Sequence, residues 1–234
     1  MIRYSKIPHK QAREIVLLKG APCVWGRCAF CDYIEDNDPD PAACARLNRE
    51  VLARVTGEYG ALEVINSASV FELPPDTLCD IRRVAEEKGI RRLFFECYWS
   101  YRDRLDEIRA FFGLPIVFKC GIETFDDDFR NRVLKKGIVF QSPAEVARYF
   151  DSVCLLVGVE GQTQEMIDRD IEILQSRFRY GCINLYQNNS TSIRRDEALV
   201  RWFCEKYRYL QDDPNIDVLL ENTDFGVGGK QDAQ

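Results

Sequence analysis

Short apolar runs alternate along the chain with longer stretches of helical period, and this alternation predicts the fold. The expected strands cover residues 14–19, 61–66, 92–96, 116–122, 153–157, 180–186 and 216–220. The expected helices cover residues 47–59, 74–88, 103–112, 127–135, 143–150, 163–178 and 196–210. Strands that alternate with helices predict an α/β fold with a parallel sheet, either doubly wound or a partial barrel.

The composition indicates one globular domain spanning residues 1–234. Hydrophobic residues make up 46% and charged residues 30% of the 234, without a linker or low-complexity segment between the expected elements. No uncharged apolar run approaches the roughly 18 to 20 residues that cross a bilayer, and the first six residues lack the apolar core of a secretion signal. We therefore expect a cytoplasmic protein without a membrane partner.

The charge pattern and the single histidine argue against several classes of ligand and catalytic site. The net charge is −6, from 38 acidic and 32 basic residues, and the basic residues are scattered, which argues against binding of long nucleic acid. His9 is the one histidine, so Ser-His-Asp, Cys-His and multi-histidine zinc chemistry are disfavoured. A small substrate and a cofactor that supplies the reactivity are expected instead.

The ten cysteines fall into groups with different expected roles. Five lie in or beside apolar segments and are expected to be small buried hydrophobes: Cys79, Cys97, Cys120, Cys154 and Cys182. Cys44 and Cys204 are assigned no role. Cys23, Cys28 and Cys31 instead share the short segment APCVWGRCAFCDY after the first expected strand.

This spacing suits three thiolate ligands of one [4Fe–4S] cluster, whose fourth iron would be open to a small molecule. Two alternatives remain from the cysteines alone. One is a structural zinc site completed by Cys44, and the other is three unrelated thiols.

Three segments in this order resemble the radical S-adenosylmethionine (SAM) superfamily. The cysteine segment has four residues between its first two cysteines where the usual motif has three, and Phe30 fits the aromatic before the last one. Cys120-Gly-Ile-Glu-Thr124 is similar to the Gly-aliphatic-Glu-Thr/Ser segment of these enzymes. Leu156-Val-Gly-Val-Glu-Gly-Gln-Thr163 is similar to their Gly-Leu-Pro-Gly-Gln/Glu-Thr turn, with Glu160 in place of the proline.

The resemblance implies a partial (β/α)6 barrel with a parallel sheet and helices outside. It also implies that SAM binds the open iron and is split by one electron into methionine and a 5′-deoxyadenosyl radical, which takes a hydrogen atom from the substrate. The cluster and SAM are thus the implied cofactors, and an external electron donor such as flavodoxin or ferredoxin is an implied partner. No further catalytic residue is assigned.

Contacts to SAM are implied for a set of residues that follow the expected strands. Asn66, Ser67 and Ser69 would meet the methionine carboxylate and amine, although short polar residues also form turns. Glu96 and Glu123 would meet the ribose diol, with a salt bridge to Arg92, Lys119 or Arg130 as the alternative. Phe30 and the backbone at Gly158 complete the implied cofactor site, although a glycine also serves a tight turn.

Late polar and aromatic residues are the candidates for substrate binding, because aromatic faces and polar edges are what a nucleobase requires. They are Tyr98, Trp99, Tyr101, Asn188, Asn222 and Asp224. Ordinary loop composition is the alternative for each of them.

Within the superfamily, the chain is similar to the group that includes the bacterial queuine lyases of queuosine salvage. The similar segments are Pro22–Tyr33, Val64–Glu72 and Asn222–Gly228. This resemblance implies a lyase that breaks a C–N bond and releases queuine from queuosine or its 5′-phosphate, a nucleoside or nucleotide substrate. The alternatives are a radical SAM enzyme on another small molecule or peptide, and a zinc-stabilised α/β binding module.

Overall fold

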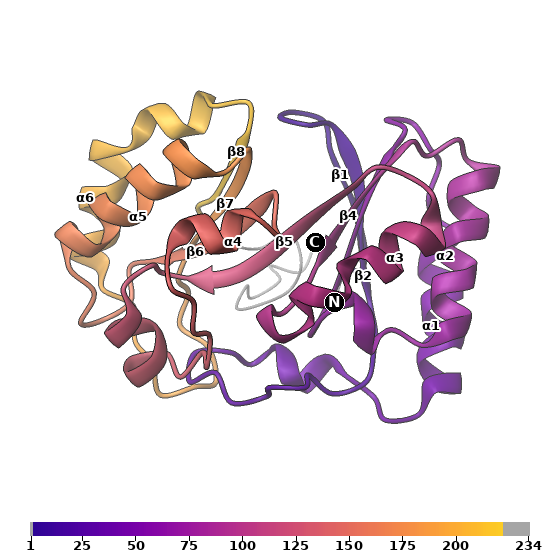
Figure 1. Ribbon diagram of the computed structural model, residues 1–234, viewed down its shortest axis with the longest axis horizontal. Coiled ribbons are helices and arrows are strands. Elements are labelled where there is room, and N and C mark those ends of the chain that lie inside the picture. Colours follow the sequence, from indigo (N-terminus) through magenta and orange to yellow (C-terminus); the bar gives the residue numbers. More distant parts are fainter. Residues whose placement is uncertain (1, 222–234) are drawn as a thin grey trace, which may run out of the picture.

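Eight strands form one curled sheet in the computed structural model, which describes residues 2–221 (Figure 1). The strands are β1 (Tyr4–Ile7), β2 (Arg13–Leu18), β3 (Ala61–Asn66), β4 (Arg92–Glu96), β5 (Ile116–Glu123), β6 (Ser152–Val157), β7 (Tyr180–Leu185) and β8 (Ile216–Leu219). Their order in the sheet is their order in the sequence, and all neighbours are parallel except β1 and β2. The predicted partial barrel is confirmed, and the doubly wound alternative is wrong because that topology reverses its strand order.

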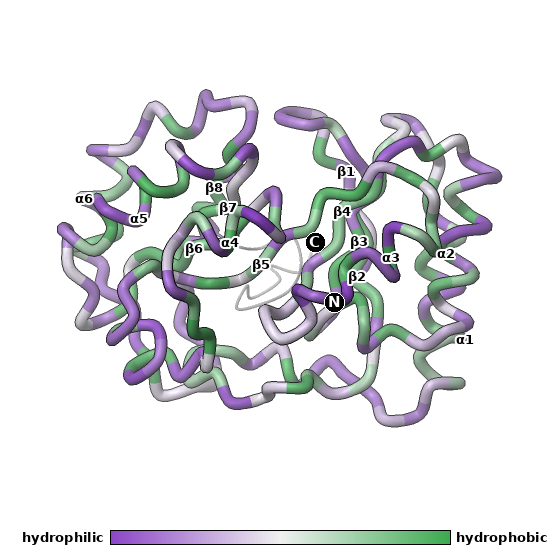
Figure 2. Tube along the Cα trace, in the orientation of Figure 1, coloured by the Kyte–Doolittle hydropathy of each residue, from purple (hydrophilic) through white to green (hydrophobic). Residues whose placement is uncertain are grey.

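The helices lie on the outside of the curled sheet (Figure 1). They are α1 (Pro41–Leu52), α2 (Pro75–Glu87), α3 (Leu105–Phe112), α4 (Pro143–Ala147), α5 (Gln164–Arg177) and α6 (Glu197–Lys206). The apolar stripe of each helix packs on the outer face of the strands, so a strand such as β2 has all six residues buried. Figure 2 shows the same pattern, with hydrophobic strands inside and hydrophilic outer helix faces. No helix within residues 2–221 has the length and apolar character needed to span a membrane.

The structure differs from the predicted secondary structure at three places. The helix expected at 47–59 begins at Pro41 and ends at Leu52, because the Asp40 side chain caps its first turn by accepting the N–H of Ala42 at 2.9 Å. The stretch expected as a helix at 127–135 is helical over residues 127–133, where a short α-helical start continues as the π-helix Phe129–Val133. Strand β1 was not predicted; it pairs antiparallel with β2.

Side chains from the two ends of the sheet meet at the amino-terminal ends of the strands. Arg13 of β2 reaches Asp217 of β8 at 2.7 Å and Glu63 of β3 at 2.5 Å. Lys10 donates to the carbonyl oxygens of Leu210 and Ile216 at 3.0 and 2.7 Å. This end of the barrel is therefore closed by polar bonds, and the space inside opens toward the carboxyl ends of the strands, where α/β enzymes place their sites.

Candidate functional site

The cysteine loop, residues 19–40, leaves β2 and passes below the carboxyl ends of the other strands (Figure 1). Distant segments hold it there. The indole N–H of Trp25 donates to the carbonyl oxygen of Lys135 at 2.9 Å, and the N–H of Ala29 donates to that of Leu134 at 2.9 Å. On the other side, Asn189 donates to the carbonyl oxygen of Phe30 at 2.7 Å. The loop is thus fixed as the floor of the opening.

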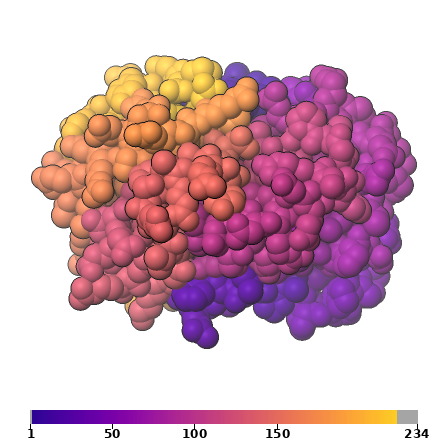
Figure 3. Space-filling view, in the orientation of Figure 1, coloured from indigo at the N-terminus to yellow at the C-terminus, as the bar shows by residue number. Residues whose placement is uncertain are grey.

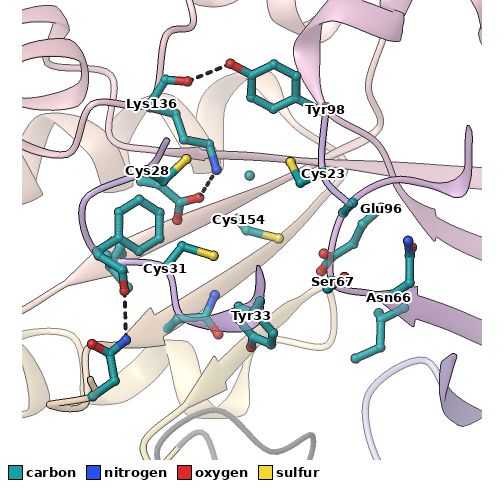
Figure 4. Close-up of a pocket in the computed structure, with 18 of the residues that line it drawn as sticks. Cys23, Cys28, Cys31, Tyr33, Asn66, Ser67, Glu96, Tyr98, Lys136 and Cys154 are labelled. Carbon is teal, nitrogen blue, oxygen red and sulfur yellow. Dashed lines mark hydrogen bonds and ion pairs between the residues drawn. The ribbon is translucent and has the colours of Figure 1, made fainter. Parts of the chain in front are cut away.

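Above this floor lies a cavity of about 1170 Å³, including its mouth, into which the thiols of Cys23, Cys28 and Cys31 point (Figure 4). The cysteine loop also contributes Phe30 and Tyr33 to the wall. The other wall residues come from the ends of β3 to β7 and from the segments after them: Ile65, Asn66, Ser67, Ala68, Glu96, Cys97, Tyr98, Gly121, Glu123, Lys136, Cys154, Leu156, Asn184, Tyr186, Gln187 and Asn189.

The three thiols fit a polynuclear cluster better than a mononuclear metal site. Among residues 2–221, no group of three or more His, Cys, Asp or Glu side chains is placed so that it could hold one metal ion. A [4Fe–4S] cluster does not need that placement, because each thiolate binds a different iron. Three sulfurs that face one common space are the donor set that such a cluster takes.

Cys44, the fourth ligand of the zinc alternative, lies elsewhere. It is buried in α1, where its thiol donates to the carbonyl oxygen of Asp38 at 3.4 Å, and it is not part of the cavity wall. The structure therefore does not bring Cys44 to the other three thiols.

Burial also sets the protonation of the cysteine loop. Burial raises the pKa of the Cys28 and Cys31 thiols, and the nearby ammonium of Lys136 only partly opposes this. Without a ligand these thiols are neutral near pH 7, so metal binding must release their protons.

One hydroxyl at the end of β3 faces the cavity without a hydrogen-bond partner. The Ser67 Oγ is buried without a hydrogen-bond partner, although it lines the wall. The Asn66 amide also lines the wall and donates to the carbonyl oxygen of Ser69 at 3.0 Å. A buried hydroxyl without a partner costs free energy unless a ligand satisfies it, so Ser67 is a candidate ligand contact. Ser69 lies behind the wall, where its hydroxyl accepts the N–H of Tyr98 at 2.8 Å.

An ion pair between Glu123 and Lys136 lies in the cavity wall opposite β3. Lys136 Nζ lies 2.6 Å from Glu123 Oε1 and 5.4 Å from the centre of the Phe30 ring. Glu123 adopts φ +67° at a break in the register of β5 with β6, and this turns its carboxylate inward. A Cβ on Gly121 would lie 2.8 Å from Glu123 Oε1, so only glycine leaves room for this pair. Sequence reasoning missed Lys136 because the stretch reads as an exposed helix.

Glu96, at the end of β4, lines the cavity with an unusual protonation state. Burial raises its pKa to about 7; Lys119 opposes this rise, and the carboxylates of Glu63 and Glu123 add to it. The carboxyl group is therefore close to half protonated at neutral pH and can either donate or accept a hydrogen bond toward a ligand.

Of the three aromatic residues predicted to bind substrate, one lies in the cavity wall and two do not. Tyr98 lines the cavity, and its hydroxyl donates to the carbonyl oxygen of Lys136 at 2.6 Å. Trp99 is buried among Phe140, Tyr149 and Phe150, while the Tyr101 hydroxyl donates to Glu72 at 2.8 Å, so neither reaches the cavity.

Asn188 and Gly158 also lie outside the wall. Asn188 accepts the N–H of Arg195 at 2.9 Å, and Gly158, with φ +87°, is pressed against Val200 of α6. Asn222 and Asp224 lie outside the residues that the structure describes.

The apolar cysteines differ from their single expected role. Cys120 and Cys182 are buried, as predicted, and Cys79 is exposed on α2, which contradicts its prediction. Cys97 and Cys154 are buried but also line the cavity. No sequence pattern indicates that Cys97, Cys154 or Asn184 lines the cavity, because the orientation of these side chains depends on how the sheet curls.

Comparisons with known proteins agree with this arrangement. No protein-family model matches the sequence. A solved structure of a queuine lyase from Clostridium spiroforme, bound to SAM and queuine, is 52% identical, with a TM-score of 0.95 over 98% of this chain and 100% of that chain. An uncharacterized protein of Methanocaldococcus jannaschii is 20% identical over 140 residues, which is 53% of this chain and only 38% of that protein.

Proposed function

This chain belongs to the queuine lyase family of radical SAM enzymes, and from that membership and the cavity we propose that it releases queuine from queuosine or queuosine 5′-phosphate. A [4Fe–4S] cluster and SAM, when bound, supply the electron and the radical that removes a hydrogen atom from the substrate. The observation that carries the proposal is one cavity whose wall contains three thiols at one side and polar and aromatic side chains at the other.

Residues of the wall divide by their chemistry into a cluster end and a SAM end. Cys23, Cys28 and Cys31 hold the cluster and leave one iron without a protein ligand. Ser67 and Asn66 offer a hydroxyl and an amide to the methionine part of SAM, in line with the unpartnered Ser67 oxygen. Glu123, held by Lys136, and Glu96 offer carboxylates to ribose hydroxyls.

The substrate end of the cavity is formed by residues at and after the end of β7. Asn184 at the end of β7 and Gln187 after it line the wall, and the Gln187 side-chain oxygen accepts no hydrogen bond from residues 2–221. Amide edges beside an aromatic ring are what recognition of an unstacked base requires. We therefore assign the 7-deazaguanine base to this side, with the ring of Tyr186, which follows β7, as its aromatic surface.

The cysteine loop also excludes water from the reacting centre. Its bonds to Lys135, Leu134 and Asn189 close the cavity from below, and the apolar Phe30 and Leu156 cover the space between thiols and sheet. A reactive carbon radical needs such protection from solvent and from side reactions.

The test is anaerobic reconstitution followed by iron and sulfide analysis and an assay with SAM, dithionite and queuosine 5′-phosphate. We expect about four irons per chain, reductant-dependent 5′-deoxyadenosine, and queuine in amounts that depend on the nucleotide. 5′-Deoxyadenosine formation without queuine from either queuosine or its 5′-phosphate would reject the substrate and keep the radical SAM chemistry. Zinc in place of iron, with no SAM cleavage, would reject both.

A further inference from the structure

A second cavity opens at the amino-terminal ends of β3, β4 and β5, at the end of the barrel opposite the cysteine loop. Its volume is about 670 Å³, including its mouth, and it shares no wall residue with the cavity beside the three thiols. In the space-filling view the indigo hairpin between β1 and β2 appears at the upper edge of the molecule, and the cysteine loop lies at the lower edge (Figure 3). We call this space the hairpin cavity; its wall includes Gln11, Tyr59, Arg91, Arg92, Phe94 and Pro115.

Two arginine side chains give the hairpin cavity a positive charge. Arg91 and Arg92 are exposed, and neither side chain forms an ion pair or a hydrogen bond with another described residue. The Arg91 guanidinium lies against Gly60, where an added Cβ would be 2.6 Å from its Nη2 atom. Arg92 begins β4 on the same face as Phe94, because alternate residues of a strand face one side. None of the described residues that line this cavity is acidic, so both guanidinium groups are available to an anion.

Gln11 adds a side-chain amide whose hydrogen bonding is incomplete. Its oxygen is buried and accepts no hydrogen bond within residues 2–221. The backbone at Lys10 and Gln11 is left-handed, with φ +48° at both, which is unfavourable for residues other than glycine. Arg13 holds this turn in place, since its guanidinium donates to the carbonyl oxygens of Lys10 and Gln11 at 3.2 Å each. A strained turn that carries an unpaired polar atom to a cavity wall indicates a contact with a ligand.

We propose that the hairpin cavity binds a small organic phosphate, a phosphate monoester on a compact carbon skeleton that carries hydroxyl groups. Two guanidinium groups suit a phosphate monoester, which has three terminal oxygens and about two negative charges at neutral pH. A hydroxyl of the ligand donates to the unpaired oxygen of Gln11. Tyr59, Phe94 and Pro115 provide apolar surface for the carbon skeleton.

This site is independent of the proposed function, because the hairpin cavity lies apart from the three thiols and needs neither a cluster nor SAM. The ligand would connect the hairpin at Gln11 to the start of β4 at Arg91 and Arg92. A ligand that binds the folded chain and not the unfolded chain raises the melting temperature. Binding should also weaken as the salt concentration rises, since the main contacts are between opposite charges.

The first test is calorimetric titration of the reconstituted full-length protein with ribose 5-phosphate, inorganic phosphate and ribose. We expect the ester to bind most tightly, inorganic phosphate more weakly, and ribose not at all. The double variant Arg91→Met/Arg92→Met should bind the ester at least about tenfold more weakly. Arg46→Met is the matched control, since Arg46 is exposed on α1 without an ion pair among the described residues, and it should bind as wild type does.

Three results of this titration would overturn the proposal. Absence of binding of ribose 5-phosphate to wild type would remove the site. Equal affinities of the double variant and Arg46→Met would place the bound ester elsewhere in the molecule. Inorganic phosphate that binds as tightly as the ester would show an anion site without the assigned class of ligand.

A second test examines the contact assigned to Gln11. Gln11→Met keeps the length of the side chain and removes its amide, so the ester should bind about tenfold more weakly while the affinity for inorganic phosphate stays unchanged. Without ligand, the melting temperature should not fall, because the variant loses only an unpaired buried oxygen. With ribose 5-phosphate, wild type should gain more in melting temperature than the variant. A lower melting temperature together with unchanged affinity for the ester would show that Gln11 is structural and contradict this contact.

Discussion

The indole of Trp25 lies directly on the backbone of Gly137: a Cβ placed on Gly137 would fall 2.1 Å from Cζ2 of the ring. Gly137 also adopts φ +66°, a conformation that other residues rarely take. The pair joins the cysteine loop to the segment that carries Lys136, so this contact helps to place the three thiols beside the Glu123–Lys136 ion pair.

Gly137→Ala should therefore destabilise the protein and loosen the cysteine loop. We expect a loss of about 2–4 kcal/mol in the free energy of unfolding, from backbone strain together with the clash against Trp25. Gly89→Ala is the control, because Gly89 has φ +65° and nothing within 4 Å of an added Cβ, so it reports the strain alone, about 1 kcal/mol. Urea unfolding of the metal-free protein gives both values. Equal losses in the free energy of unfolding of the two variants would show that the contact between Trp25 and Gly137 does not stabilise the protein.

The cysteines of the loop and of α1 should differ in their effect on metal content. Cys28→Ala removes one of three ligands, so we expect the variant to remain folded while retaining little iron and cleaving no SAM. Cys44→Ala removes a buried thiol outside the cavity and should keep the full iron content, with a loss of at most about 1 kcal/mol in stability. Iron and sulfide analysis with the visible spectrum distinguishes them. Normal cluster content in Cys28→Ala would contradict the ligand assignment.

Ser67→Ala should weaken SAM binding without destabilising the protein. Its hydroxyl is buried and unpartnered, so its removal costs the ligand-free protein nothing, whereas a lost bond to a charged SAM group lowers affinity by about tenfold or more. Ser152→Ala is the matched control, because its hydroxyl is equally buried and unpartnered but lies outside the cavity. Equilibrium dialysis of SAM with reconstituted enzyme measures the difference. Equal SAM affinities would remove Ser67 from the site.

Most of the barrel follows from local pattern, because buried parallel strands are continuous apolar runs. Strands β3 and β4 have the predicted bounds, 61–66 and 92–96. The prediction for α1 is wrong because it follows the apolar spacing from residue 47 onward. The true start of the helix is marked by Asp40, a capping side chain, and by Pro41 after it. Strand β1 was not predicted because its four residues are mostly half-buried and form no apolar run. Its pairing with β2 makes it a strand.

The candidate site divides along a similar line. The three cysteines follow β2 and Ser67 follows β3, each within a short distance of the strand end. Their positions in the sequence are therefore enough to place them at the carboxyl-terminal edge of the sheet. Lys136 and Cys154 could not be found that way. Lys136 enters the cavity only because Glu123 turns inward at its left-handed φ and Gly121 leaves space beside it. Such contacts depend on how the folded chain packs, and they produce no periodic pattern in the sequence.

Glu96 should make stability depend on pH near neutrality. Burial raises its pKa to about 7, so its contribution is fully present below its ordinary pKa of 4.5 and is lost as pH rises through 7. Glu96→Gln lacks this titration and should gain up to about 2 kcal/mol relative to wild type between about pH 5 and about pH 8. Thermal or urea unfolding of the metal-free proteins at both pH values gives this difference. Because Asp170, whose pKa burial also raises to about 7, is present in both proteins, it cancels. Parallel pH profiles would contradict the raised pKa.

Arg13→Met should open the closed end of the barrel. Arg13 is buried and bonds both Glu63 and Asp217, so the variant leaves carboxylates with less compensation, at a cost of about 3–5 kcal/mol. Arg83→Met on α2 removes ion pairs from a half-exposed arginine and should cost less than about 1 kcal/mol.

The pH dependence of the Arg13→Met loss gives a second readout. Burial alone would raise the pKa of Glu63, but Lys119 and Arg13 outweigh it and lower the pKa to about 2. The stability that Glu63 contributes is therefore present above its ordinary pKa of 4.5 and is lost as pH falls toward 2. In Arg13→Met the pKa of Glu63 should rise toward its ordinary value, so less of the remaining stability is lost in acid, measurable as a shallower fall in the free energy of unfolding between about pH 5 and about pH 3. A loss no larger than that of Arg83→Met, with an unchanged pH profile, would show that the barrel does not depend on this closure.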